Sequence, residues 1–233
     1  MELINKDNNK IIIVIASLIF SIIAGILTKD LLLGGSTLFT GLLCAYYAGK
    51  GNKINYILGL INYILMGYIS YKNNLYGLFV FNILLFAPLQ IKGYIDWGEN
   101  QNKENSVKVR EFTLKNGIII TVSCIIGSFI IGYLLSLIPG QRLALLDASS
   151  NCINLCGIML MVLRFKEAWW IWLVNNIIDL VIWIITAIGQ GDNSIMMLLV
   201  SVGYLLINIW GIYKWNKEVR ISKIGVANGD VGV

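Results

Sequence analysis

Long apolar stretches follow one another along almost the whole chain. About 20 apolar residues span a bilayer, and this length predicts eight membrane-spanning helices. Their expected positions are 11–28, 31–48, 54–71, 75–95, 117–138, 143–163, 168–188 and 194–215. The links are short except for the polar segment 96–116, and Pro88 should bend the fourth helix. We therefore expect an all-α membrane protein with a single transmembrane domain over residues 1–233, ending in a polar, disordered tail from 216 to 233.

The stretch 168–188 carries polar residues in the middle of an apolar run. Trp172, Asn176 and Asp179 fall at positions i, i+4 and i+7, which places an indole, an amide and a carboxylic acid on one stripe of a helix. A carboxylate facing lipid at mid-depth costs at least about 2.5–3.5 kcal/mol. This stripe, together with Asn175, should therefore face protein or a wet cavity, and we assign it to a substrate pocket.

Other spans supply further polar candidates for this pocket. In 143–163, Asp147, Asn151 and Asn154 form a second stripe, although Asp147 is equally suited to cap the start of that helix. The residues that we assign to the pocket are Asn62, Tyr76, Asn82, Gln90, Asp147, Asn151, Trp172, Asn175, Asn176, Asp179 and Tyr204. Tyr76 and Tyr204 are equally suited to pack between helices. The alternative role for Gln90 is a hydrogen bond that joins two helices.

A motif recurs in the two halves of the chain. Residues 93–97 (GYIDW) and 211–215 (GIYKW) both read G-x-x-x-W at the end of an apolar span. Asn62 and Asn176 correspond at an offset of 114 residues, because 176 − 62 = 114. This repetition predicts two related units of three helices.

The two units, 31–95 and 143–215, start on the same side of the membrane and are therefore parallel. An odd number of spans reverses the direction of the chain, so a linker helix at 117–138 must lie between them. The helix at 11–28 is then an extra N-terminal one. A substrate site between two parallel repeats is typical of one class of transporter.

Composition and charge agree with a multi-pass membrane protein. Of the 233 residues, 57% are hydrophobic and 13% are charged, whereas soluble domains carry about 25% charged residues. All of the 18 Lys and Arg residues except Lys29, Lys72 and Arg142 fall on the side that holds both expected termini. The positive-inside rule makes that side cytoplasmic. The net charge of +5 therefore reports topology and does not indicate a nucleic-acid partner.

The inventory of reactive side chains argues against an enzyme. The sequence contains no His, the commonest general base and metal ligand. The cysteines, at positions 44, 124, 152 and 156, lie in apolar spans and are interpreted as small packing residues. We expect no metal site, no cofactor and no catalytic residues.

Three segments resemble the PnuC family of bacterial vitamin transporters. They are GLINYILMGYISYKNNLYG (59–77), GYIDW (93–97) and the stretch from LDASSN to VIW (146–183). The resemblance implies a SWEET-like fold of three, one and three helices, usually with one extra N-terminal helix. It also implies facilitated diffusion of nicotinamide riboside, trapping by a cytoplasmic kinase that makes no stable contact, and a homotrimer.

The resemblance leaves the substrate open. Relatives are assigned to thiamine, riboflavin or deoxynucleosides, and carriers of nicotinamide riboside have a small hydroxyl residue where this chain has Asp179. A carboxylate there is suited to a cationic ring, an aminopyrimidine or a ribose. A rival function is the substrate-binding subunit of an ATP-driven vitamin importer, which would not transport by itself.

Overall fold

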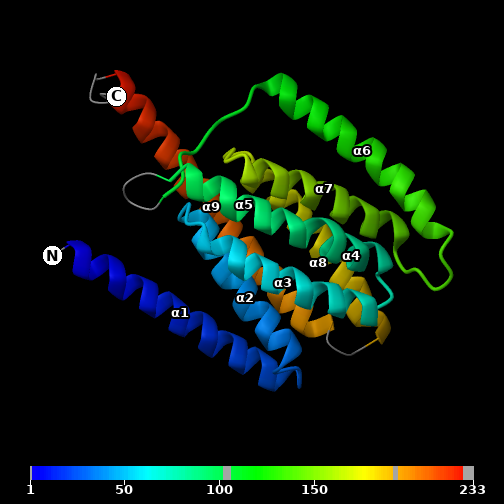
Figure 1. The fold of residues 1–233 in the computed structure, drawn as a ribbon. Coiled ribbons are helices and arrows are strands. Elements are labelled where there is room, and N and C mark those ends of the chain that lie inside the picture. The colour runs from blue at the N-terminus through cyan, green and yellow to red at the C-terminus, as the bar shows by residue number, and fades with distance from the viewer. Residues whose placement is uncertain (1, 102–105, 191–193, 228–233) are drawn as a thin grey trace.

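The structure is a computed structural model that describes residues 2–101, 106–190 and 194–227. The described residues confirm the all-α prediction (Figure 1). The helices are α1 (Glu2–Leu27), α2 (Leu33–Gly49), α3 (Ile54–Lys72), α4 (Tyr76–Phe81), the π-helical turn η1 (Asn82–Phe86), α5 (Ala87–Glu99), α6 (Leu114–Ser136), α7 (Ala144–Val162), α8 (Ala168–Gln190) and α9 (Ser194–Ala227).

Six helices within the described residues are long and apolar enough to cross a membrane. They are Ile54–Lys72, Tyr76–Glu99, Lys115–Ser136, Ala144–Val162, Ala168–Gly189 and Ile195–Ile221. Ile11–Leu27 is a shorter apolar helix, and α2 has 17 residues, many of them buried inside the bundle. The protein is thus a multi-pass membrane protein, and the count of eight spans remains a prediction.

Two local expectations concern the helix at Pro88 and the tail. The helix contains the π-helical turn η1 just before Pro88, where the N–H of Ala87 donates to the carbonyl of Asn82, one residue beyond the α-helical partner, and the bend at Pro88 stays a prediction. The predicted disordered tail is wrong as far as Ala227, because α9 continues to that residue. Polar composition marks the exit from the apolar region, but Lys214 and Glu218 form an i,i+4 ion pair of 3.9 Å and Val219 is buried, so the helix persists.

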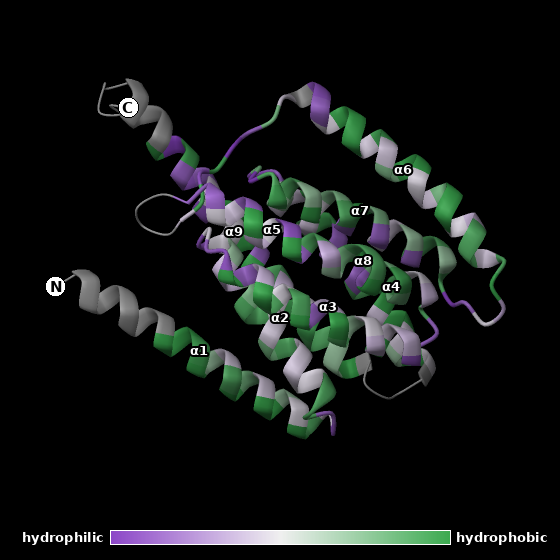
Figure 2. Ribbon diagram, in the orientation of Figure 1, coloured by the Kyte–Doolittle hydropathy of each residue, from purple (hydrophilic) through white to green (hydrophobic). Residues whose placement is uncertain are grey.

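The helices form a bundle flanked by α1 on one side and α6 on the other (Figure 1). In the bundle, α2 packs against α3 and α9, α7 packs against α8, and α6 lies on α7. The start of α1 and the end of α9 lie toward the same side of the view (Figure 1). Figure 2 shows hydrophobic residues along α1 and α6 and hydrophilic residues gathered in the loops, as expected for helices that face lipid.

Two apolar clusters divide the core along the bundle. One cluster surrounds Trp97, Trp169 and Trp215, each with an exposed fraction of 0%, and we call this part of the bundle the tryptophan end. The other cluster contains Ile69 and Met196 and lies toward the opposite end. Both clusters contribute side chains to one cavity, which therefore lies between them.

The two G-x-x-x-W motifs make reciprocal contacts between the halves of the chain. The indole N–H of Trp97 donates to the carbonyl of Met161 at the end of α7, over 3.0 Å. The indole N–H of Trp215 donates to the carbonyl of Gly49 at the end of α2, over 3.1 Å. The Trp of each motif therefore bonds to the first helix of the other half.

The glycine of each motif leaves room for an aromatic ring. A Cβ at Gly93 would collide with the ring of Tyr56, and a Cβ at Gly211 would collide with the ring of Trp169. The repeated motif thus combines a close contact at the glycine with a directional hydrogen bond one turn later. Both parts join helices at the tryptophan end.

The segment between α5 and α6 crosses the loops of both halves. The N–H of Val107 donates to the carbonyl of Gly51, which follows α2, over 2.9 Å. The N–H of Arg110 donates to the carbonyl of Arg164, which follows α7, over 2.8 Å. We call residues 106–111 the strap, and its contacts hold the α2–α3 and α7–α8 loops near each other.

Candidate functional site

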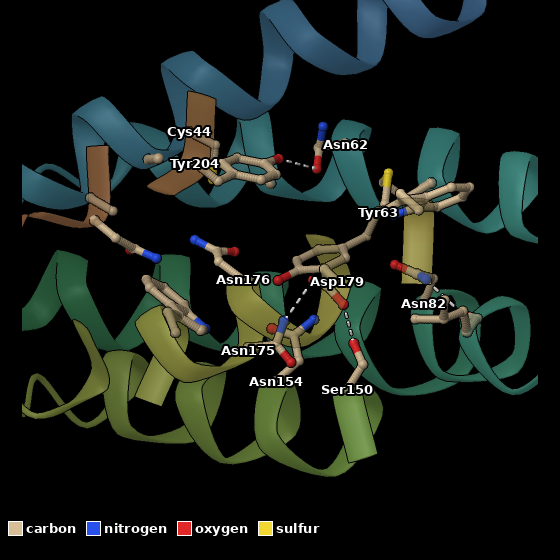
Figure 3. Close-up of a pocket in the computed structure, with 18 residues that line it drawn as sticks. Cys44, Asn62, Tyr63, Asn82, Ser150, Asn154, Asn175, Asn176, Asp179 and Tyr204 are labelled. Carbon is tan, nitrogen blue, oxygen red and sulfur yellow. Dashed lines mark hydrogen bonds between the residues drawn. The ribbon is translucent and has the colours of Figure 1, made fainter. Parts of the chain in front are cut away.

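A cavity of about 120 Å³ lies inside the bundle, lined by residues of α2, α3, α4, η1, α7, α8 and α9. Its walls combine amides, aromatic rings and one acid (Figure 3). The polar and aromatic lining residues are Cys44, Asn62, Tyr63, Asn82, Ser150, Asn154, Trp172, Asn175, Asn176, Asp179, Trp183, Tyr204 and Asn208.

Most of the residues that the sequence assigned to a pocket meet in this cavity. The stripe on α8 is present as expected, with Trp172, Asn176 and Asp179 all in the lining. Asn175 joins them from the same helix. The lining also includes Asn62 of α3, Asn82 of η1 and Tyr204 of α9.

The other four assigned residues lie outside the cavity lining. They are Tyr76, Gln90, Asp147 and Asn151. The hydroxyl of Tyr76 donates to Asn74 over 2.9 Å. The amide of Gln90 donates to the carbonyl of Phe86 one turn earlier, over 3.3 Å. None of the four is part of the cavity lining.

Asp147 and Asn151 instead form a buried polar contact at the start of α7. The amide of Asn151 donates to Asp147 Oδ1 over 2.7 Å, and Gln141 Nε2 donates to Asp147 Oδ2 over 2.6 Å. The carboxylate also lies against Gly77 in the first turn of α4. It makes no cap for its own helix, which has Leu143 at the N-cap, and it supports the start of a neighbouring helix instead.

The face of α7 that lines the cavity is carried by Ser150 and Asn154, not by Asn151. Residues 150 and 151 differ by about 100° around a helix, so Asn154 of the predicted stripe lines the cavity while Asp147 and Asn151 lie on a neighbouring face of α7. A signal for the correct face was Gly157, which follows Ser150 at i+7. A Cβ at Gly157 would collide with the indole of Trp172. The glycine therefore lets this ring of α8 approach the backbone of α7 closely.

Asp179 is held by hydrogen bonds from two helices (Figure 3). The hydroxyl of Ser150 donates to its Oδ1, and Asn175 Nδ2 donates to its Oδ2 over 2.8 Å. Among the described residues that line the cavity, there is no Lys or Arg. The cavity thus presents one acid that has hydrogen-bond donors but no cationic partner in the wall.

Asn62 joins three helices, α2, α3 and α9, in another part of the cavity wall. Its Oδ1 accepts a hydrogen bond from the hydroxyl of Tyr204 over 3.0 Å (Figure 3). Its Nδ2 donates to the carbonyl of Thr37 over 2.7 Å and to Thr40 Oγ1 over 3.1 Å. Both polar atoms of the Asn62 side chain therefore have partners within the protein. In this structure Asn62 positions the ring of Tyr204.

Among the residues of α8 that line the cavity, three buried polar atoms have no hydrogen-bond partner within the described part of the chain. They are the indole N–H of Trp172, the Oδ1 of Asn175 and the Nδ2 of Asn176. Buried polar groups are normally paired, and all three belong to residues of the cavity lining. Together they offer two donors and one acceptor to a ligand.

The described residues contain no group of three or more His, Cys, Asp or Glu that could hold a metal ion. Cys124 and Cys156 lie with their sulfurs 3.0 Å apart between α6 and α7, away from the cavity lining. Cys44 is the cysteine that lines the cavity. The arrangement is suited to binding a flat polar molecule between rings and amides.

Comparisons with known proteins agree with a binding site of this kind. A family described as Nicotinamide mononucleotide transporter matches residues 31–217. The chain is 32% identical to the nicotinamide riboside transporter PnuC of Neisseria mucosa over 188 residues, which cover 78% of this chain and 70% of that protein. It is 28% identical to the PnuC of Haemophilus influenzae over 87% of each chain.

A solved structure has the same fold. The crystal structure of the vitamin B3 transporter PnuC superposes with a TM-score of 0.78 and 28% sequence identity. The match covers 89% of this chain and 90% of that one. The family match over residues 31–217 includes residues from all of the helices that build the cavity.

Proposed function

The chain belongs to the nicotinamide mononucleotide transporter family, and we propose that it carries nicotinamide riboside across the membrane. It is a transporter and not an enzyme. The observation that carries the proposal is the cavity inside the bundle between two apolar clusters, lined by amides and aromatic rings. Cavities with a few convergent polar groups are the usual binding sites for small molecules.

The lining favours the nucleoside over the nucleotide, although the family description names the mononucleotide. A phosphate group is usually met by Arg or Lys, and the described lining has neither. A phosphate would also be repelled by Asp179. Nicotinamide riboside lacks that group, which agrees with the names of the two relatives.

The unpartnered atoms of α8 suggest how the ligand lies. The carboxamide of nicotinamide has an oxygen that can accept from Trp172 or Asn176, and an NH₂ group that can donate to Asn175. The flat ring would stack on the aromatic walls, where such contacts contribute about 1–3 kcal/mol per ring in nucleic-acid binders. Tyr76, Gln90, Asp147 and Asn151 would support the surrounding helices without touching the substrate.

Transport would follow from opening the two ends of the bundle in turn. We take α2 to α5 as one triplet, α6 as the linker, and α7 to α9 as the second triplet. The reciprocal bonds of Trp97 and Trp215 support this pairing, since each joins one triplet to the first helix of the other. The tryptophan end would face the cytoplasm, together with both termini, in the bacterial inner membrane.

The transport would be facilitated diffusion, made effectively one-way when a cytoplasmic kinase phosphorylates the product. Apart from Asp147 and Asp179, α7 and α8 have no acids with which to relay protons. A homotrimer is the assembly that the family resemblance implies.

Uptake into liposomes that contain only the purified protein tests the function. We expect nicotinamide riboside to equilibrate without ATP, and nicotinamide mononucleotide to enter at least tenfold more slowly. Accumulation above the outside concentration that depends on a pH gradient would contradict facilitated diffusion. A protein that binds the riboside but never transports it would instead fit the subunit of an ATP-driven importer. Competition by thiamine, riboflavin and deoxynucleosides would show whether another vitamin is the better substrate.

A further inference from the structure

We propose that Asp179 makes the cavity select a permanently cationic ring over a neutral ring of the same shape. The inference rests on the proposed function and names the class of substrate that this particular chain accepts. It would admit pyridinium or thiazolium rings and disfavour neutral flavins and deoxynucleosides. Four observations support it: the hydrogen bonds of the acid, its place in the wall, the absence of a cation there, and the apolar surroundings.

The hydrogen bonds fit the ionised form of the acid. Ser150 donates to one oxygen and Asn175 donates to the other. A carboxylate is an acceptor only, with about four lone-pair sites, whereas a protonated acid must donate through one oxygen. The two donors occupy part of this capacity and leave lone pairs for a ligand.

The negative charge is not cancelled within the cavity. The other described lining residues are uncharged amides, hydroxyls, thiols, rings and apolar groups. Asp179 therefore has no salt-bridge partner among the described residues of the wall. A cationic substrate would supply the missing charge.

The surroundings strengthen the attraction. The cavity lies between the apolar clusters of Trp169 and Met196, which lowers the effective dielectric constant around Asp179. A charge interaction of 4 Å is worth about four times more at an effective dielectric constant of 20 than in bulk water. A neutral ring gains nothing from this field, so the two ligands should differ by a factor of at least ten.

The aromatic walls would also favour a cation, and this contribution must be separated from that of the acid. Trp172 and Tyr63 offer ring faces in the same cavity, and cation–π attraction does not involve the carboxylate. An Asp179→Asn variant removes the charge while it keeps the shape and both rings. The change in selectivity caused by this variant therefore reports the acid alone.

A competing role for Asp179 is a hydrogen bond to the hydroxyls of a ribose. That role predicts equal losses for cationic and neutral ligands when the acid is replaced, because both carry the same sugar. The charge role predicts a loss for the cation only. Two ligands and two proteins thus decide between the roles.

The experiment measures the binding of nicotinamide riboside and of its 1,4-dihydro form by calorimetry, in wild type and in Asp179→Asn. The dihydro form has the same sugar and carboxamide but a neutral ring. We expect wild type to prefer the cation at least tenfold, and the variant to reduce this ratio at least tenfold with little change for the neutral ligand. Ser149→Ala is the matched control, since Ser149 is a serine of the same helix as Ser150 that lies outside the cavity lining, and its ratio should stay within threefold of wild type.

Several results would overturn the inference. They are equal losses of both ligands in Asp179→Asn, an unchanged ratio in that variant, or a wild-type preference below threefold. The wild-type ratio does not depend on any variant, so a wild-type preference below threefold overturns the inference even if Asp179→Asn does not fold. If wild type binds and transports both ligands equally, the inference fails while the proposed function stands. If it binds and transports neither, the proposed function itself fails.

Discussion

Replacing Trp97 or Trp215 by Phe should destabilise the protein by similar amounts, because the two residues make the same contact in opposite directions. Each variant removes an indole N–H that bonds to a carbonyl of the other half, at Met161 or at Gly49. A buried acceptor left without its donor costs about 1–3 kcal/mol in soluble proteins. Side-chain hydrogen bonds between membrane helices average about 0.6 kcal/mol and reach about 1.7. We therefore expect a loss of about 1–2 kcal/mol for each variant.

The double variant should lose less than the sum of the two single losses. The rings of Trp97 and Trp215 are 6.0 Å apart, and residues in contact commonly show coupling energies of about 0.5–3 kcal/mol. Unfolding by a denaturing detergent in mixed micelles gives the free energies. Trp170→Phe is the control, since Trp170 is 52% exposed on the outer face of α8 and should change the stability by less than about 0.5 kcal/mol.

The reasoning would be refuted if both variants at the tryptophan end matched Trp170→Phe. It would also be refuted if only one of the pair were destabilising, because the reciprocal geometry gives them equivalent roles. A loss in both, with the riboside still bound in the cavity, would show that these bonds hold the halves together and take no part in recognition.

Further predictions concern the cavity and the strap. Gly157→Ala should weaken binding of nicotinamide riboside at least tenfold in calorimetry, because the new methyl group displaces the indole of Trp172; normal affinity would show that the indole does not contact the ligand. Asn62→Ala and Tyr204→Phe should each weaken binding of nicotinamide riboside. The double variant should bind no more weakly than Asn62→Ala alone, because the two residues share one hydrogen bond. Additive losses of affinity would contradict that coupling. Glu111→Lys should lower the free energy of unfolding by less than about 1 kcal/mol, because Glu111 forms an ion pair with Lys166. Adding Lys166→Glu should restore the lost stability. A swap that fails to rescue the single variant would mean that the pair contributes nothing.

The helices and the main stripe of the site could be predicted from the sequence because each depends on local information. Hydrophobic length gave the spans, and the spacing of Trp172, Asn176 and Asp179 gave the inward face of α8. The inward face of α7 could not be settled in the same way. Asp147 and Asn151 share a helical spacing of four with Ser150 and Asn154, so the pattern alone fits either face.

What decides between the two faces is the neighbouring helix. Ser150 meets the carboxylate of Asp179 on α8, while Asp147 meets the start of α4 and Gln141. Both sets of contacts satisfy buried polar groups, and Asp179 and the start of α4 are far in the sequence from the residues of α7 that they contact. The error in the tail has a similar origin, because composition indicates where a helix leaves the apolar region but not where its backbone hydrogen bonds end.

Glycine facing an aromatic ring serves both to close the bundle and to build the cavity. At the tryptophan end, Gly93 and Gly211 admit rings, and the indoles of the same motifs reach carbonyls of the other half. In the cavity, Gly157 admits the indole of Trp172, but that N–H meets no protein acceptor among the described residues. The same close contact of glycine with a ring therefore occurs at the tryptophan end and in the cavity wall, and in the wall it presents the indole N–H of Trp172 to a ligand.

Trp169 lies between a ring of the cavity wall and a ring of the tryptophan end. Its ring lies 5.5 Å from that of Trp172 and 5.9 Å from that of Trp215, between centroids, and its own N–H lacks a partner within the described chain. A ligand that moves Trp172 would therefore press on Trp169 and, through it, on one of the two reciprocal bonds. Rings in direct contact, rather than a distant signal, would then link an occupied cavity to the opening of the tryptophan end.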